Sequence, residues 1–290
     1  MIAALPWPDW RQGLVAAVAA ALAHAAVART APDRRARSLL PALHELAVVY
    51  GLYALWRSAK QLPLVQADGA IDRARRIAAL QDAWGLPSEL TFQRFLLRHD
   101  DLAWLASAYY ATLHVPALIA FLVWLFARHR DRYGRWRDAL AIATGGCLLI
   151  RFWRVAPPRF LPDLGYVDVA ALRGFDVYGP VGTGVSQQFV AMPSIHVAWA
   201  AIVGLGALAS TRSPWRWVVF AHLPITFVVV AATGHHWWLD GIVALGLVGL
   251  GLAVDVGVRR ASEALGDRRE EVVVLREGAE GRELGDHVVG

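Results

Sequence analysis

The sequence predicts an all-α protein: a polytopic transmembrane helix bundle of about six to seven spans with an interfacial amphipathic helical segment. Of the 290 residues, 57% are hydrophobic and 18% are charged, and the mean hydropathy is +0.40. Ordinary soluble domains carry about 25% charged residues, so the apolar excess is too large for one soluble core. Several windows reach the roughly 17 to 25 apolar residues of a spanning helix, and the alternation of a β-barrel is not visible.

Seven apolar runs mark the predicted spans, at about 13–28, 39–56, 102–127, 138–155, 194–210, 215–233 and 237–257. Residues 1–38 are expected to form an N-terminal transmembrane helix and a cytoplasmic loop, and residues 39–257 the main transmembrane domain. The first run could instead be a cleaved signal peptide, because it ends in the small residues Ala25-Ala26-Val27-Ala28. Cleavage would leave a cluster of arginines outside, against the positive-inside rule, so an uncleaved helix is favoured.

Two segments are not expected to span the membrane. Residues 58–100 are interrupted by Pro63 and Pro87, and apolar residues recur there at helical spacing opposite arginines, which predicts an interfacial amphipathic helix (Ile77, Leu80 and Trp84 opposite Arg73, Arg75 and Arg76). Ser88 is predicted to cap a second short helix; a solvated helical hairpin packed on the protein is the alternative. Residues 258–290 mix both charge signs with glycine, which predicts a disordered charged cytoplasmic tail.

The arginines set the predicted orientation. The net charge of +5 and the isoelectric point near 9.8 come almost wholly from arginines beside the apolar runs. We interpret them as topology signals and lipid-headgroup contacts and expect no nucleic-acid partner. With seven spans and an outer N-terminus, the inner loops carry most of them: Arg29 to Arg37, Arg128 to Arg137, Arg212 and Arg216, and Arg259-Arg260. The 157–193 loop and the starts of the fifth and seventh runs then lie on the extracytoplasmic face of the cell membrane.

His236 and Asp240 stand where the last run begins, four residues apart. On a helix their side chains lie on one face of successive turns. The carboxylate can then hold one imidazole nitrogen and leave the other as an oriented nucleophile or base; a purely structural hydrogen-bonded pair has the same spacing. Cys147 is the single cysteine, so neither an intrachain disulfide nor a cysteine-based metal site is expected.

A second polar segment, Pro193-Ser194-Ile195-His196, begins the fifth run. Proline suits the first turn of a helix and serine can cap it, while the free N–H groups and the dipole at that end attract a phosphate. Ser194 can add a hydroxyl donor, and His196 can protonate a leaving alkoxide. The alternative is an ordinary capped helix with a histidine that reaches the membrane surface.

Arginines at the outer end of the fourth run form a third element, with Arg151, Arg154 and Arg159 as candidate phosphate ligands. A guanidinium can clamp phosphate oxygens bidentately, and Arg159 is preferred because it follows a rigid diproline. Membrane-interface anchoring is the alternative for each arginine. His235 could contact substrate, or face the membrane interface together with Trp237 and Trp238.

The three elements in this order resemble the signature segments of the type 2 phosphatidic acid phosphatase superfamily: Arg159 after Pro-Pro, Pro193-Ser-Ile-His196, and His236-x-x-x-Asp240. The resemblance covers about residues 40–257. The longer segments Ala191-Met192-Pro193-Ser194-Ile195-His196 and Thr233-Gly234-His235-His236 are more similar to the inositol phosphorylceramide synthase-like branch.

The resemblance implies that residues 39–257 form a phosphatase-like catalytic domain that needs neither a metal nor a cofactor. His236 would attack phosphorus to give a phosphohistidine, Asp240 would orient it, and His196 would protonate the leaving group. Arg159 and Ser194 would hold the phosphate oxygens. The expected substrate is a lipid phosphate or phospholipid, and the acceptor is water in a phosphatase or an alcohol, such as a polyol, in a phosphotransferase.

The chain departs from the superfamily pattern at three positions. The usual first segment has a lysine, six residues and then Arg-Pro, whereas here Arg151 precedes Arg159 by eight positions. An arginine usually stands six residues before the nucleophile, where this chain has Val230; Arg154 or Arg173 is the candidate replacement. The second segment usually has glycine in place of Ile195, and this difference fits the synthase-like branch.

Two other functional classes remain open at this point. A histidine-metal membrane enzyme would use His196, His235, His236 and Asp240 as ligands, but such sites usually show recurrent histidine boxes and this chain has one His-His pair. A transporter or scaffold would keep these residues as buried structural polar groups. Matching broken half-spans in two repeated halves would favour that class, and no such repeat is visible.

Overall fold

The computed structural model of the protein describes residues 8–30, 34–59, 69–150, 152–175 and 189–286. Within them the chain is helical, with one isolated β-bridge between Val155 and Val190. The long helices are α1 (Trp10–Thr30), α3 (Leu40–Ala59), α6 (Asp100–Thr112), α7 (His114–Arg128), α8 (Arg130–Ile150), α11 (Ile195–Ser210), α12 (Trp215–Ala232) and α13 (Trp238–Asp286). Shorter elements are α2 (Arg34–Arg37), α4 (Ala70–Ala83), α5 (Glu89–Leu97), α9 (Val169–Leu172), η1 (Pro158–Phe160) and η2 (Pro162–Leu164). The predicted all-α class is confirmed.

All seven apolar runs fall on helices, but fewer are long and apolar enough to span a membrane. Among the described residues four helical segments meet both conditions: Trp10–Thr30, Arg34–Ala59, Trp215–Ala232 and Trp238–Ser262. The α6–α7 pair, bent by 52°, adds a fifth if it forms one span. Of the other two predicted spans, α11 has only 16 residues, and α8 begins with the charged stretch Arg130–Asp138.

α11 lies at the centre of the bundle, against α7, α8, α12 and α13. Most of its residues are buried, and many are alanine or glycine. Small residues let neighbouring helices approach closely: a Cβ on Gly206 would stand 2.3 Å from the ring of Phe121. Likewise, a Cβ on Gly251 of α13 would meet the backbone of Ala139 on α8 at 2.9 Å. The bundle therefore depends on close helix contacts around α11.

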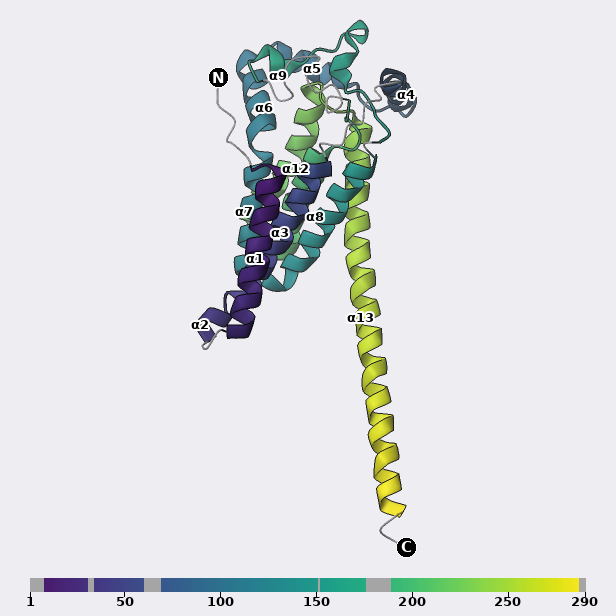
Figure 1. Ribbon diagram of the computed structural model, residues 1–290. Helices are drawn as coiled ribbons and strands as arrows, with labels where there is room; N and C mark the ends of the chain where they lie inside the picture. The colour runs from purple at the N-terminus through teal and green to yellow at the C-terminus, as the bar shows by residue number, and fades with distance from the viewer. Residues whose placement is uncertain (1–7, 31–33, 60–68, 151, 176–188, 287–290) are drawn as a thin grey trace.

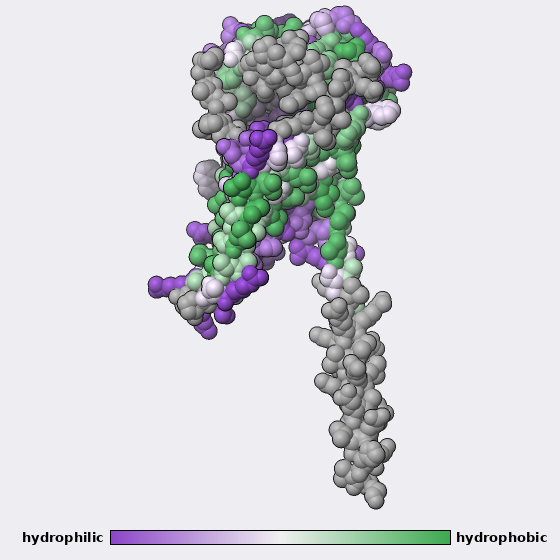
Figure 2. Space-filling view, viewed as in Figure 1, coloured by the Kyte–Doolittle hydropathy of each residue, from purple (hydrophilic) through white to green (hydrophobic). Residues whose placement is uncertain are grey.

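The outer surface of the bundle is apolar. Figure 2 shows a hydrophobic band across the middle of the molecule, with hydrophilic residues above and below it. Large hydrophobic side chains are exposed along α1, α3, α6, α12 and α13, among them Leu14, Val15, Leu22, Leu105 and Val218. Soluble monomers rarely expose continuous apolar surface of this extent, whereas lipid tails accommodate it. The protein is a multi-pass membrane protein.

α4 and α5, together called the α4–α5 hairpin, lie at the same end of the bundle as α9 (Figure 1). As predicted, 70–83 is helical and Ser88 caps α5, its Oγ accepting a hydrogen bond from the Leu90 N–H at 3.3 Å. The buried side of α4 consists of Ala70, Ala74 and Gln81, while Leu80 and Trp84 remain exposed. α4 thus packs on the protein through small residues and one glutamine, and insertion of its apolar side into the membrane interface stays a prediction.

The last helix is longer than the sequence suggests. α13 continues to Asp286 and extends beyond the opposite end of the bundle (Figure 1), whereas residues 258–290 were predicted to be disordered. Glutamate and arginine, which have high helix propensity, are with valine the commonest residues of the tail, so it can prolong the helix already started by the membrane span. The predicted domain boundaries at 38 and 257 stay predictions.

Candidate active site

His236 lies in the loop between α12 and α13, and its imidazole contacts Asp240 in the first turn of α13. The Nδ1 atom of His236 lies 2.7 Å from the carbonyl oxygen of Ala191 and 3.3 Å from Oδ2 of Asp240. The same Oδ2 accepts the Trp237 N–H at 2.8 Å. His236 is 3% exposed and Asp240 is fully buried. The i, i+4 geometry predicted from the sequence is therefore present, with a backbone carbonyl as a second partner of the imidazole.

These contacts fix the tautomer of His236. A carbonyl oxygen and a carboxylate oxygen only accept hydrogen bonds when the carboxylate is ionised, so Nδ1 carries the proton and Nε2 keeps its lone pair. Nε2 is buried and has no hydrogen-bond partner among the described residues. An imidazole oriented at one nitrogen and unpaired at the other has the arrangement of an activated nucleophile or base. Burial, aided by the nearby Arg159 guanidinium, lowers the pKa of His236 to about 3, so the ring is neutral at physiological pH.

The loop before His236 reaches this position through a glycine. Gly234 has φ of +81°, a left-handed conformation that glycine adopts without strain. A Cβ at this position would stand 2.6 Å from the Val167 carbonyl oxygen and 2.8 Å from Nε2 of Gln93. The carbonyl of Val230 then accepts the N–H groups of both His235 and His236 at 3.0 Å. The loop is thus held by backbone contacts on both sides.

Ser194 and His196 lie at the start of α11, facing this loop. The Ser194 side chain is fully buried, and its Oγ caps the helix by accepting the Val197 N–H at 3.4 Å. The Ser194 N–H donates to the Asp240 carbonyl at 3.1 Å, which ties the first turns of α11 and α13 together. The rings of His196 and His236 stand 5.7 Å apart between centroids. The two predicted segments therefore meet in space.

Arg159 joins the site from the η1 segment, and its partner is Asp168. The Arg159 N–H donates to the Gly234 carbonyl at 3.0 Å, and its Nε lies 3.2 Å from Oδ2 of Asp168. Asp168 Oδ1 is 3.8 Å from Nε2 of His235, whose ring also contacts Tyr110 at 4.2 Å between centroids. Burial lowers the pKa values of both His235 and His236, and the positive charge of the nearby Arg159 lowers them further.

The remaining candidate arginines differ in their surroundings. Arg154 is 3% exposed, and its Nη1 and Nη2 atoms have no hydrogen-bond partner within the described part of the chain. Arg173 forms an ion pair with the exposed Asp100, so it is an unsuitable replacement for the missing cation. Arg151 lies outside the described residues. A buried guanidinium without a partner is costly, and Arg154 is therefore the better candidate for binding an anion.

Comparison with protein families is consistent with these three segments. A family model described as the PAP2 superfamily matches residues 75–254. The chain belongs to the PAP2 superfamily. Membership supports an enzyme of the phosphatase or phosphotransferase type. Neither the search of curated proteins nor that of solved structures found a match.

Three features of this PAP2 site were missed or misplaced by the sequence. The Ala191 carbonyl has no side-chain signal, because the backbone pairing of Ala191 with Val155 positions it. Asp168 belongs to none of the three sequence segments, yet it pairs with Arg159. Trp237 and Trp238 are buried and donate from Nε1 to the carbonyls of Ala156 and Pro87, which disfavours the alternative in which they face the membrane interface together with His235.

The described residues also bear on the metal alternative. No group of three or more His, Cys, Asp or Glu side chains is arranged there to hold a metal ion. His236 faces a carbonyl and a carboxylate through Nδ1, and His235 contacts Thr233 Oγ1 at 3.0 Å and Asp168. The two adjacent histidines thus have separate partners and do not converge on one point.

Proposed function

We propose that the protein transfers a phosphoryl group from a lipid phosphate through a phosphohistidine at His236. The Nε2 lone pair forms a bond to phosphorus as the bond between phosphorus and the leaving oxygen breaks, and His196 gives that oxygen a proton. Water or an acceptor alcohol, deprotonated by His196, then attacks phosphorus and releases Nε2. The observation that carries the proposal is the imidazole of His236, held at Nδ1 by two acceptors with Nε2 unpartnered among the described residues.

The phosphate oxygens need several donors in this site. Arg159 is held beside this loop by the Gly234 carbonyl, and the Ser194 hydroxyl keeps its proton available for a phosphate oxygen because its own oxygen accepts the Val197 N–H. Arg154 supplies a second buried cation in a chain that has Val230 where the superfamily has arginine. Such donors stabilise the charge that develops on the phosphoryl oxygens in the transition state. Arg151 and His235 stay as further proposed substrate contacts.

The proposed site faces the extracytoplasmic side of the cell membrane. The arginine-rich α2 lies at the end of the bundle opposite α4, α5 and α9 (Figure 1), and clusters of arginine mark cytoplasmic ends. The substrate headgroup would enter from the outer leaflet. The family match over 75–254 lies inside the proposed catalytic domain of residues 39–257.

Transfer to an alcohol is the second candidate reaction. It is favoured by the segments Ala191 to His196 and Thr233 to His236, which resemble the inositol phosphorylceramide synthase-like branch. In that reaction a polyol headgroup alcohol replaces water as the acceptor. A phosphatase releases inorganic phosphate, whereas a transferase yields a new phosphodiester when acceptor is added, so product analysis separates the two.

The function is tested with purified protein in detergent and a panel of phosphatidic, isoprenyl and inositol phospholipids, with chelator present. We expect turnover of at least one lipid phosphate, unaffected by the chelator, with phosphate or a new phosphodiester as product. Absence of turnover on every lipid, with the protein shown to be folded, would contradict the proposal. Loss of activity on chelation, restored by stoichiometric metal, would instead support the histidine-metal enzyme.

The pH dependence follows from the neutral state of His236. Its pKa is lowered to about 3 by burial, so the nucleophile stays unprotonated as the pH falls from 7 to 5. The neutral fraction of a histidine with the ordinary pKa of about 6.5 would fall about 25-fold over this range. We expect kcat/KM to fall less than about 3-fold between pH 7 and 5, measured where the folded fraction is constant. A fall in kcat/KM centred near pH 6.5 would contradict the lowered pKa of His236, provided that the fall persists when each of the other histidines near the site is replaced.

Arg154 provides a prediction about substrate binding. Arg154→Lys keeps one charge but loses the planar two-pronged donor, and Arg154→Met removes the charge with similar length. We expect kcat/KM to fall about 10-fold for Lys and 100-fold or more for Met, since a charge-assisted contact to phosphate is worth about 1.5 to 3 kcal/mol. Arg173→Met is the control, because Arg173 pairs with exposed Asp100. Equal kinetics for Arg154→Met and Arg173→Met would remove Arg154 from the phosphate site.

A further inference from the structure

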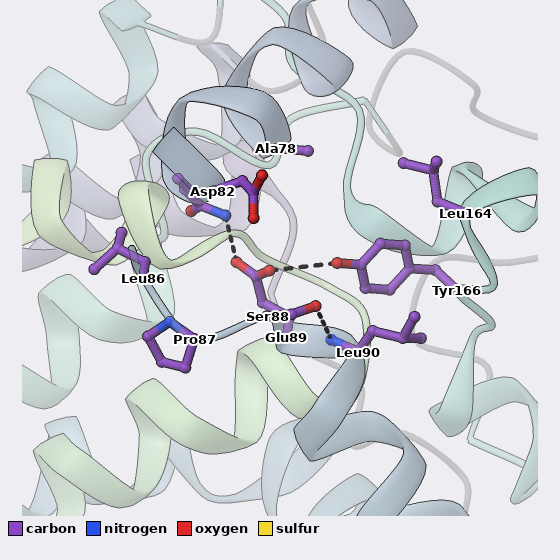
Figure 3. A pocket seen from close by; sticks show the side chains of 10 residues that line it. Ala78, Asp82, Leu86, Pro87, Ser88, Glu89, Leu90, Leu164 and Tyr166 are labelled. Carbon is purple, nitrogen blue, oxygen red and sulfur yellow. Dashed lines mark hydrogen bonds between the residues drawn. The ribbon is translucent and has the colours of Figure 1, made fainter. Parts of the chain in front are cut away.

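Three polar side chains of the α4–α5 hairpin are buried beside the loop that carries His236 and the start of α13. Gln81, Glu89 and Gln93 are 3%, 2% and 0% exposed. Residues of this kind are rarely buried without a partner, and each of them is hydrogen-bonded here. Figure 3 shows Glu89 at a cavity of about 240 Å³ between α4, α5 and Tyr166.

Glu89 and Gln81 cap the N-terminus of α13. The Trp238 N–H donates to Oε1 of Glu89 at 2.9 Å, and the Leu239 N–H donates to Oε1 of Gln81 at 2.9 Å. Gln81 Nε2 in turn donates to Oε1 of Glu89 at 2.7 Å. The first N–H groups of a helix have no partner within that helix, and here they find acceptors more than 140 positions away in the sequence.

The capped turn carries the catalytic pair. His236 stands two residues before Trp238, and Asp240 directly follows Leu239. Asp240 completes the same cap from within the helix by accepting the Trp237 N–H at 2.8 Å, and its Oδ2 also lies 3.3 Å from His236. The three consecutive N–H groups of residues 237–239 are thus satisfied by Asp240, Glu89 and Gln81. A shift of this turn moves Asp240 relative to His236.

Gln93 holds the other side of the same loop. Its Oε1 accepts the Val167 N–H and its Nε2 donates to the Val167 carbonyl, both at 2.9 Å. A Cβ on Gly234 would collide with both Gln93 Nε2 and the Val167 carbonyl. The hairpin therefore contacts the catalytic loop on both sides of His236, at Gly234 and at Trp238.

The carboxylate of Glu89 is buried, and burial of a charged group is unfavourable relative to its exposure to solvent. Burial raises the pKa of Glu89, and its contacts are made by Gln81, Trp238 and the Tyr166 hydroxyl, the last at 3.4 Å from Oε2. No cation contacts its carboxylate among the described residues. A structural cap for an ordinary helix is usually a local Ser, Thr, Asp or Asn, so a buried glutamate from a distant helix indicates a specific requirement at this turn.

We propose that Gln81 and Glu89 are positioning residues of the active site, which hold the first turn of α13 so that Asp240 keeps His236 aligned for attack on phosphorus. The inference rests on the proposed function of His236. The α4–α5 hairpin would then position the active-site residues, in addition to any contact it makes with the membrane interface. The hairpin acts through Asp240 and does not itself touch the substrate.

The test uses Glu89→Ala and Gln81→Met, each removing one acceptor, with the full-length protein in detergent. We expect kcat per folded molecule to fall about 10- to 100-fold with KM changed less than about 3-fold, because small misplacements at a reacting centre have effects of this size. Glu89→Gln keeps Oε1 as acceptor for the Trp238 N–H and should restore most of kcat. Arg75→Ala is the matched control on α4, because it breaks only the exposed 2.7 Å ion pair with Asp163, and it should leave kcat within 2-fold.

A double-mutant cycle separates positioning from general destabilisation. In an Asp240→Asn background, Gln81→Met should cost less than 2-fold, because both changes act on the same alignment. Additive losses in the cycle, or a normal kcat per folded molecule in both single variants, would overturn the proposal. The folded fraction of each variant is measured from its thermal transition, and kcat is divided by this fraction. A variant that folds poorly is therefore compared with the wild-type protein per folded molecule. If the wild-type protein shows no turnover that depends on His236, the proposed function fails; if such turnover exists and the cycle is additive, only the positioning role fails.

Discussion

Replacing His236 by asparagine is expected to reduce turnover of the lipid phosphate by about 10⁴-fold or more, since removal of a catalytic nucleophile has effects of this size. Asparagine is chosen because its amide N–H can still donate to the Ala191 carbonyl, which His236 Nδ1 contacts at 2.7 Å. The variant therefore loses the Nε2 lone pair while keeping the contact that holds the loop. The measurement is the initial rate on the best substrate of the wild-type protein.

The control for this variant is its folding. The wild-type protein and His236→Asn should have the same elution from a sizing column and thermal transitions within a few degrees. His99→Asn is a matched substitution, because His99 is an exposed N-cap residue of α6, and it should retain full activity. A His236→Asn protein that is folded and keeps more than about a tenth of wild-type turnover would show that His236 is not the nucleophile, and a purely structural role for the pair would then be preferred.

Asp240→Asn is expected to have the second-largest effect, a fall in kcat of about 100- to 1,000-fold. The carboxylate Oδ2 accepts both the Trp237 N–H and the His236 Nδ1–H, and a neutral amide has one acceptor oxygen and no charge to stabilise the imidazolium-like transition state. In a serine protease triad the corresponding change costs about 10⁴-fold. The loss should be smaller here, because the Ala191 carbonyl holds the same nitrogen at a shorter distance.

The kinetic signature of Asp240→Asn distinguishes orientation from binding. KM should change little, since Asp240 is fully buried behind the imidazole, and the decrease should appear in the rate of phosphohistidine formation. Asp255→Asn is the comparison, because Asp255 is also buried on α13 but pairs with Arg259. A large rise in KM with unchanged kcat would indicate that Asp240 contacts substrate, contrary to the geometry.

Much of the fold was predictable from the sequence. Hydrophobic runs of membrane length identify helices because backbone groups must be satisfied within lipid, and all seven runs fall on helices. The number of spans stays a prediction, because α11 is short and its small residues serve internal packing, as Gly206 against Phe121 illustrates. The hairpin of α4 and α5 was located, but its buried glutamine and glutamate were not recognised as contacts of α13.

The candidate site was predictable where it depends on local spacing. The i, i+4 relation of His236 and Asp240 and the capping by Ser194 follow from helix geometry, and both are present. Contacts between distant segments were not predictable, because nothing in the sequence places Asp168 beside Arg159 or the Ala191 carbonyl beside His236. Polar residues in such loops look solvated until the fold brings their partners together.

The most direct test of the phosphohistidine is chemical trapping. Wild-type protein is mixed with a ³²P-labelled lipid phosphate, quenched in alkali within one turnover, digested and mapped by mass spectrometry. We predict label on the peptide containing His236, stable in alkali, lost in acid, and removed by a chase of unlabelled substrate at a rate no slower than kcat. Label on another residue, or none while product forms in a burst, would contradict the central claim that His236 carries the phosphoryl group.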